Sequence, residues 1–134
     1  MTIDDPARSM LAADRSLGRL GITVEGASGG RAVALLVVTP EMANGHGIAH
    51  GGFVFSVADT AFAMAANTLG PSIATADASI TYLTPAHVGE HLLAEAEVTF
   101  NEGRRVIVDV TVRSGERTVA IYRGTGRALR TTAG

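Results

Sequence analysis

Strict alternation of apolar and polar side chains marks several segments of the chain. The clearest is the run from Val106 to Val112, in which every second residue is valine. An apolar–polar period of two is typical of a β-strand with one buried face. This alternation, together with runs of β-branched residues, predicts about six strands, at residues 20–24, 31–38, 73–83, 91–100, 105–113 and 117–127. Short turns rich in Gly, Ser, Asn and Glu favour antiparallel hairpins between neighbouring strands.

A different pattern occupies the middle of the chain. Residues 51–69 are dominated by Ala, Phe, Val and Met, and Asp59 is their only ionisable side chain. Ala and Met favour helix and no Pro interrupts, so a helix is predicted from about Gly52 to Thr68. Apolar residues cover nearly its whole circumference, which predicts a buried helix wrapped by other elements. A membrane span is disfavoured because polar side chains interrupt a segment that is barely long enough to cross.

These elements predict one α+β domain over residues 1–134, with a long central helix wrapped by a curled antiparallel sheet of about six strands. Ahead of the first strand, residues 5–17 place apolar side chains at near-helical spacing behind Asp4, Asp5 and Pro6. Gly18 is a natural helix stop. Residues 1–18 are therefore expected to form an N-terminal helical arm that packs on the domain and carries no chemistry.

Composition limits the classes of binding partner that can be expected. The 134 residues carry a net charge of −2 without runs of like charge, so neither nucleic acid nor a membrane surface is expected. The chain has no cysteine, which excludes disulfides, thiolate metal sites and a Cys nucleophile. A hydrophobic fraction of 46% and a mean hydropathy of +0.25 favour an oligomer that hides further apolar surface. Acidic residues precede any apolar run at the N-terminus, which argues against a signal peptide and predicts a cytoplasmic protein.

The candidate chemistry lies at the start and in the middle of the predicted helix. Gly51 and Gly52 leave backbone N–H groups unobstructed at the helix N-terminus, where a developing oxyanion would be stabilised. A carboxylate within an apolar helix is costly unless it is bonded or paired. Asp59 therefore has either a catalytic role or a structural one, at a subunit contact or bonded to a neighbouring strand.

The spacing of these two groups constrains any shared reaction. Asp59 lies eight residues beyond Gly51, which is about 12 Å along a helix axis. One helix cannot present both groups to one small reacting centre. Two antiparallel helices related by a two-fold axis can do so, and an active site here should be shared between subunits.

The residues around this helix resemble a known family. The string HGGFVFSVADTAFA at 50–63, preceded by NGHG at 44–47, is similar to the signature of the phenylacetic-acid-degradation thioesterases of the hotdog-fold superfamily. The segments at 80–86, 103–105 and 119–124 resemble later strands of that family. The resemblance covers about residues 39–127. It implies a hotdog fold, hydrolysis of acyl-CoA thioesters between paired subunits, and a homotetramer built as a dimer of dimers.

The resemblance also implies roles by position. The Gly51 N–H would polarise the thioester carbonyl, and Asn44 would hold that carbonyl or the attacking water. Asp59 from the partner subunit would attack directly or deprotonate water, and both roles stay open. Thr75 is similar to the hydroxyl that orients the water. His50 would order the loop or contact the site, with an ordinary structural histidine as the alternative.

The substrate follows from the same resemblance. It implies an acyl-CoA, with a phenylacetyl or hydroxyphenylacetyl type of acyl group, and no separate cofactor, because coenzyme A is part of the substrate. Arg104 and Arg105 suit the phosphates of coenzyme A, although a solvated turn is the commoner interpretation of such a pair. The phenylalanines at 53, 55 and 62 are expected in the core and not in an acyl pocket.

Other interpretations remain to be weighed. Histidines four residues apart, at 46/50 and at 87/91, have a spacing that binds metal on a helix, but they lie among glycines or near a strand start, and no metal is expected. An acyl-CoA hydratase or dehydratase on the same fold would use a His with a carboxylate, which fits the Gly-Gly…Asp pattern poorly. A non-catalytic acyl-CoA-binding protein would leave Asp59 to satisfy a subunit contact alone.

Overall fold

In the computed structural model, which describes residues 2–70 and 72–129, six antiparallel strands form one sheet in the order β1-β2-β4-β5-β6-β3. The strands are β1 (Ile22–Ser28), β2 (Arg31–Val37), β3 (Ile73–Tyr82), β4 (His91–Glu102), β5 (Arg105–Ser114) and β6 (Arg117–Ala128). The helices are α1 (Asp5–Ala13), α2 (Leu17–Leu20) and α3 (Gly51–Asn67), with a 3-10 turn, η1 (Pro40–Met42).

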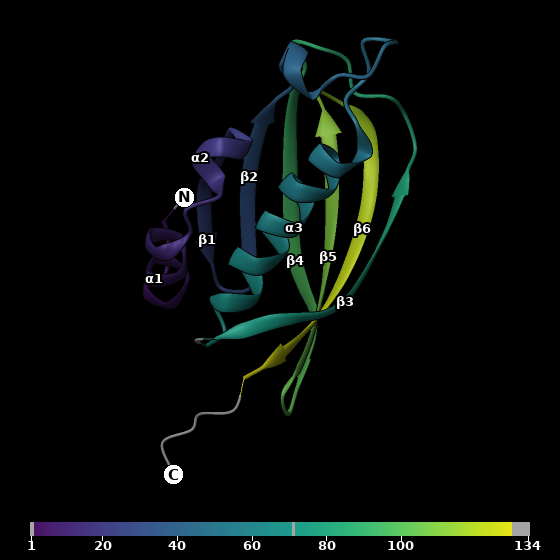
Figure 1. Ribbon diagram of the computed structural model, residues 1–134. Helices are drawn as coiled ribbons and strands as arrows, with labels where there is room; N and C mark the ends of the chain where they lie inside the picture. Colours follow the sequence, from purple (N-terminus) through teal and green to yellow (C-terminus); the bar gives the residue numbers. More distant parts are fainter. Residues whose placement is uncertain (1, 71, 130–134) are drawn as a thin grey trace.

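The sheet curls around α3, which crosses its concave face and contacts β2, β4 and β5 most extensively (Figure 1). Alternate side chains of these strands point inward and join the buried side of α3 in a continuous hydrophobic core. This arrangement confirms the predicted α+β fold with a long helix in a curled antiparallel sheet. In the described part of the chain, no helix is both long and apolar enough to cross a membrane.

Glycines on β6 let α3 approach the sheet closely. A Cβ added to Gly124 would lie 2.5 Å from the ring of Phe62, which is fully buried on α3. A Cβ on Gly126 would lie 2.7 Å from the Ile73 side chain. Because real Cβ contacts of this length do not occur, glycine at 124 lets α3 lie close to β6, and glycine at 126 leaves room for the Ile73 side chain of β3.

The element boundaries largely match the prediction. The helix predicted over 52–68 lies at 51–67, and five of the six strands begin within a residue of the expected position. β1 is the exception, and it also continues to Ser28 through residues that the sequence predicts as a loop. The turn from β1 into β2 consists only of Gly29 and Gly30. Their φ angles of 58° and 79° are in the left-handed region that glycine favours.

The N-terminal arm is not the single helix that the sequence predicts. The carboxylate of Asp14 accepts hydrogen bonds from the backbone N–H of Ser16 at 2.8 Å and from its hydroxyl at 2.6 Å. This local turn competes with helix and ends α1 at Ala13. Gly18 lies inside α2, so the expected stop there is wrong, and Gly21 with φ 73° ends the arm instead.

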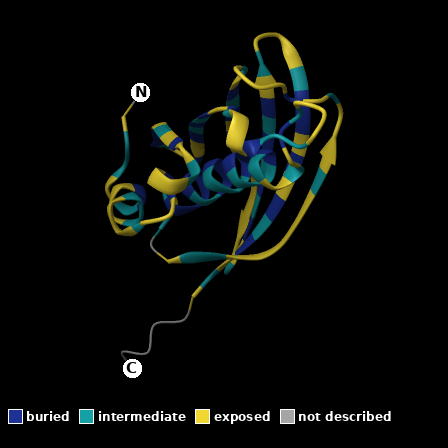
Figure 2. Cartoon of the chain, turned by 45° about the horizontal axis from the view of Figure 1, so that its top comes forward, coloured by how far each residue is buried: buried dark blue, intermediate teal, exposed yellow. Residues whose placement is uncertain are grey.

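Part of the surface of a single chain is less covered than predicted. The expectation of a helix buried on all sides is wrong for one stripe of α3, where Phe55, Ser56 and Asp59 are only partly buried (Figure 2). β3 pairs only with β6, forms one edge of the sheet and is exposed along most of its length. Unpaired backbone groups on such an edge are a template for another strand.

Candidate active site

The N-terminus of α3 presents two backbone donors. Gly51 and Gly52 open the helix, and within residues 2–70 and 72–129 neither N–H has a hydrogen-bond acceptor. His50 occupies the N-cap position with an exposed side chain that makes no capping bond. Its backbone N–H donates to the Met42 carbonyl at 2.9 Å, which fixes the entry of the chain into the helix.

The loop before α3 is held by Asn44. Its side-chain Oδ1 accepts hydrogen bonds from the N–H of His46 at 2.8 Å and of Ile48 at 3.3 Å. The Asn44 N–H also donates to the Ile48 carbonyl at 2.8 Å. The oxygen of the amide is therefore used inside the loop, and its NH2 group makes no hydrogen bond with the described residues.

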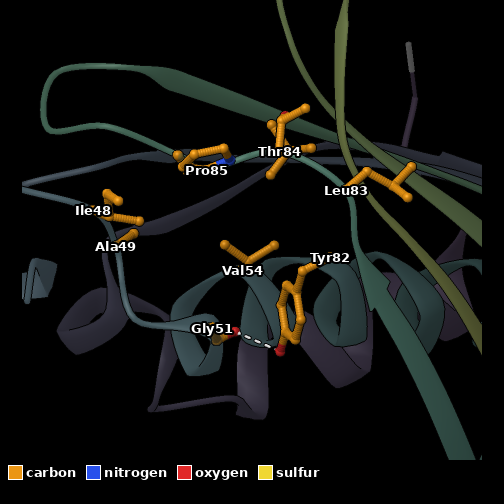
Figure 3. Close-up of a pocket in the computed structure, with 10 residues that line it drawn as sticks. Ile48, Ala49, Gly51, Val54, Tyr82, Leu83, Thr84 and Pro85 are labelled. Carbon is orange, nitrogen blue, oxygen red and sulfur yellow. Dashed lines mark hydrogen bonds between the residues drawn. The ribbon is translucent and has the colours of Figure 1, made fainter.

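A groove of about 450 Å³, here called the Gly51 groove, begins at this helix end. Its walls are mostly apolar and include Ile48, Val54 and Leu83 (Figure 3). The ring of Tyr82 lies across Gly51, and its hydroxyl donates to the Gly51 carbonyl at 3.0 Å. A Cβ on Gly51 would lie 2.9 Å from that ring, so glycine at this position allows the ring to lie so close to the helix.

Asp59 lies two turns further along α3 and is bonded across the core. The hydroxyl of Tyr122, from β6, donates to Asp59 Oδ1 at 2.6 Å. Tyr122 is fully buried, with its ring 5.5 Å from that of Phe55. Burial, and then the bond and the negative charge of Asp59, raise the pKa of Tyr122 far above its ordinary value, so it remains a donor. Oδ2 accepts no hydrogen bond from the described residues.

A second hollow, here called the Asp59 cavity, has a volume of about 410 Å³. Asp59, Thr60 and Thr75 all line it, so the structure brings together two of the residues that the sequence singles out, Asp59 and Thr75. Phe55 packs against the hydrophobic core, as expected, and also lines this cavity.

The two groups of candidate residues remain apart within one chain. Gly51 lines its groove at the start of α3, and Asp59 lines its cavity further along, with no residue common to both. Asn44 and His50 lie at the Gly51 end and line neither space. One chain thus holds backbone donors at one place and a carboxylate with a threonine hydroxyl at another.

Comparison with known proteins identifies the family. The sequence profile of the thioesterase superfamily matches residues 46–121, which include residues 46–50 of the loop before α3 and the whole helix. Over 119 residues, the chain is 37% identical to acyl-coenzyme A thioesterase PaaI from Escherichia coli K12, covering 88% of this chain and 85% of that protein. The chain belongs to the thioesterase superfamily.

Solved structures agree with this assignment. The thioesterase superimposes on the E. coli PaaI protein with a TM-score of 0.89 and 34% identity, covering 95% of this chain and 93% of that one. A variant of the phenylacetic acid degradation protein PaaI from Thermus thermophilus gives a TM-score of 0.83 and 34% identity, covering 87% of this chain and 100% of that one. The predicted hotdog fold, the family resemblance and the expectation of a thioester hydrolase are confirmed.

The two arginines of this thioesterase that suit the coenzyme A phosphates lie away from both hollows. Arg104 lies in the β4–β5 turn and Arg105 begins β5, at the opposite end of the sheet from the loop before α3 (Figure 1). The Arg104 guanidinium donates to the Ala128 carbonyl at 3.1 and 2.7 Å, and Arg105 is exposed. Neither lines the Gly51 groove or the Asp59 cavity, and their role toward phosphates stays a prediction.

The four histidines do not combine into a metal site in the structure. Over residues 2–70 and 72–129, no group of three or more His, Cys, Asp or Glu side chains is placed to hold a metal ion. The bridge between Ile48 and His87 is a backbone contact between the loop before α3 and the β3–β4 connection.

Sequence reasoning missed two residues that position the site. Tyr122 is indicated by the sequence only as part of a strand, although its alternation with Ala120 and Gly124 places it on the inward face, where a tyrosine hydroxyl needs a partner. Asn67 is buried, its Nδ2 donates to the Ala63 carbonyl at 2.8 Å, and its Oδ1 accepts from the Ile73 N–H at 3.0 Å. It ties the end of α3 to the start of β3.

Proposed function

We propose that this thioesterase hydrolyses acyl-CoA thioesters to a free acid and coenzyme A, at a site completed by a second copy of the chain. The observation that carries the proposal is the separation of Gly51 and Asp59 into two different hollows of one chain. Each hollow has one part of the chemistry that thioester hydrolysis needs. A two-fold axis that makes two α3 helices antiparallel would bring the complementary parts together twice per dimer.

The first part stabilises negative charge. The carbonyl oxygen of a thioester becomes an oxyanion when the carbon is attacked, and fixed donors lower the energy of that state. The Gly51 N–H, without an acceptor among the described residues, suits this role, and the helix dipole adds to it. Because the Asn44 oxygen is used inside the loop, its NH2 group is the part of that side chain that would hold the carbonyl or the water.

The second part supplies or activates the nucleophile. In one route Asp59 takes a proton from water, the water oxygen bonds to the carbonyl carbon, and the C–S bond breaks to release the coenzyme A thiolate, which is then protonated. In the other route Asp59 attacks the carbonyl itself, and the C–S bond breaks to release the coenzyme A thiolate, which is then protonated. Water hydrolyses the resulting anhydride to the free acid and regenerates the Asp59 carboxylate. Tyr122 engages Oδ1, so Oδ2 would act in either route, with Thr75 orienting the water.

The exposed edge strand supports the assembly. Antiparallel pairing of β3 with the β3 of a second copy would satisfy its open backbone groups and continue the sheet across the two-fold axis. It would also set the two α3 helices side by side in opposite directions. We propose a dimer of this kind, two of which form a homotetramer, located in the cytoplasm.

The substrate class comes from similarity to PaaI. We propose a phenylacetyl or hydroxyphenylacetyl type of acyl group, with Arg104 and Arg105 as the candidates for the coenzyme A phosphates and His50 as a loop-ordering residue. No metal or further cofactor enters either route, because the carboxylate and the backbone donors suffice for the chemistry.

Subunit complementation tests the shared site. Release of free thiol from phenylacetyl-CoA would be measured for wild type, Asp59→Asn, Asn44→Ala, and a mixture of the two variants after subunit exchange. Both variants should be nearly inactive alone. In mixed dimers one site has both native residues, so random exchange should restore about a quarter of wild-type activity. No recovery despite demonstrated exchange would contradict a shared site, and full activity of Asp59→Asn would contradict the role of that carboxylate.

A further inference from the structure

We propose that the N-terminal arm (α1 and α2) forms the far wall of the acyl-binding pocket and that Met10 sets the depth of this pocket. The inference rests on the proposed function, because it takes Asp59 as the group that meets the thioester. The sequence predicts that the arm only packs on the domain. This inference gives the arm a role in binding the substrate.

The lining of the Asp59 cavity combines an apolar part with polar side chains, which besides Asp59 are Asp14, Ser16, Ser56, Thr60 and Thr75. Phe55 and Ala63 of α3 and Ile73 of β3 line it, together with Met10 of α1 and Leu20 of α2. Among the residues that the structure describes, no basic side chain lines the cavity, whereas Asp14 and Asp59 do. An acyl group whose thioester carbon lies at Asp59 would extend along an apolar surface with carboxylates nearby. The cavity therefore suits neutral acyl groups with an apolar part and disfavours acyl groups that end in a carboxylate.

A third hollow adjoins this one. It has a volume of about 360 Å³ and is lined by residues that include Pro6, Asn67 and Leu129. Met10 and Ile73 line both this hollow and the Asp59 cavity. These two residues therefore lie where the two spaces adjoin, and in this proposal their side chains form the partition. Ile73 is fixed by its strand and by Asn67, whereas Met10 contributes an unbranched and flexible side chain from a short helix.

The arm that carries Met10 is anchored to the domain. Asp4 Oδ2 accepts a hydrogen bond from the Gly29 N–H at 3.0 Å, and the Asp4 N–H donates to the Ala27 carbonyl at 2.8 Å. Ala7 of α1 is completely buried. Because the start of α1 is attached to the β1–β2 hairpin in this way, Met10 is held at the cavity as a wall and not as a loose end.

The test is how kcat/KM of the Met10→Ala variant depends on the length of the acyl chain. kcat/KM would be measured for straight-chain acyl-CoAs of increasing length and for phenylacetyl-CoA, with Asp59→Asn as the inactive reference. Opening the partition should move the optimum to longer chains, with a gain of about fourfold in kcat/KM for each further methylene that becomes buried. Met10→Trp, which fills the space, should move the optimum to shorter chains.

Leu11→Ala is the matched control. Leu11 is the next residue of α1, is also a partly buried apolar residue packed on the core, and lines neither of the two hollows. It should leave the chain-length profile unchanged, so an equal shift in Leu11→Ala would mean that loosening of the arm is the cause and would overturn the assignment to Met10.

Three further results separate the hypotheses. Unchanged profiles for folded Met10→Ala and Met10→Trp, with Asp59→Asn inactive, would overturn this inference and leave the proposed function intact. Equal changes in KM for all acyl-CoAs would mean that the coenzyme A part of the substrate, and not the acyl group, lies in the cavity. This result would also overturn the inference. Undiminished turnover by Asp59→Asn would refute the proposed function itself.

Discussion

Tyr122→Phe tests the hydrogen bond that Tyr122 donates to Asp59, and it does so with a very small change in the structure. It removes one hydroxyl group and keeps the ring, which packs edge-on against Phe55 and at 5.9 Å from Phe62. Asp59 Oδ1 then loses its donor in the core. The carboxylate itself, the Asp59 cavity and the Gly51 groove are otherwise unchanged.

The expected size of the effect follows from that bond. A hydrogen bond to a charged acceptor contributes about 1.5–3 kcal/mol to stability. Asp59 is partly exposed, so water can replace the lost donor, and the lower end applies: about 1.5 kcal/mol, or a fall in Tm of about 6 °C. A carboxylate that is no longer fixed leaves its reactive geometry for part of the time, and kcat should fall about ten- to a hundredfold. KM should stay near wild type, because Tyr122 does not line the Asp59 cavity.

Steady-state thiol release and thermal unfolding on the same samples measure both effects. Arg123→Gln is the control, since Arg123 is the next residue of β6 but pairs with Asp109 on the outer face of the sheet. It should retain wild-type kcat. If Tyr122→Phe kept full kcat while Asp59→Asn was inactive, the orientation of Asp59 would not depend on this hydroxyl, and the reasoning would be refuted.

Two further predictions concern pH and packing. The folded state raises the pKa of Tyr122, whose ordinary value is 10.0, so the unfolded chain loses this proton first and stability should fall as pH rises above about 10. In Tyr82→Phe, where Tyr122 is the only tyrosine, tyrosinate absorbance at 295 nm should appear only together with unfolding measured by circular dichroism; its appearance in the folded protein would contradict the burial of the hydroxyl. Gly124→Ala should destabilise by about 1–3 kcal/mol in denaturant unfolding because its methyl would enter the Phe62 ring. Gly18→Ala, with open space around its Cβ, should instead be neutral or slightly stabilising, and equal losses in the two variants would contradict the packing argument.

The sequence predicts the elements well because their signals are local. An apolar run without Pro is enough to place α3, and two-residue alternation is enough for β5. The N-terminal arm shows the limit of such signals. Gly18 is a good stop by itself, but the Asp14–Ser16 turn ends α1 earlier, since a nearby carboxylate competes for the same backbone donors.

The site is harder to predict because its contacts are not local. Asp59 and its donor Tyr122 are 63 positions apart, and they meet only because α3 crosses the sheet over β6. The order of the strands, in which β3 pairs with β6 and not with the following β4, has no signature in any one segment. The association of Thr75 with Asp59 is expected from family resemblance, whereas nothing in the sequence predicts that the arm lines the same cavity.

The bond between Tyr122 and Asp59 also bears on how this protein can change over evolutionary time. Replacing Asp59 by an apolar residue would leave a buried phenol without an acceptor and would cost stability whether or not the reaction is needed. Asn retains an acceptor oxygen, so it is the substitution by which a lineage could lose the carboxylate and keep its fold. Inactive descendants of this chain should therefore carry Asn beside a retained Tyr, or should have exchanged both residues together.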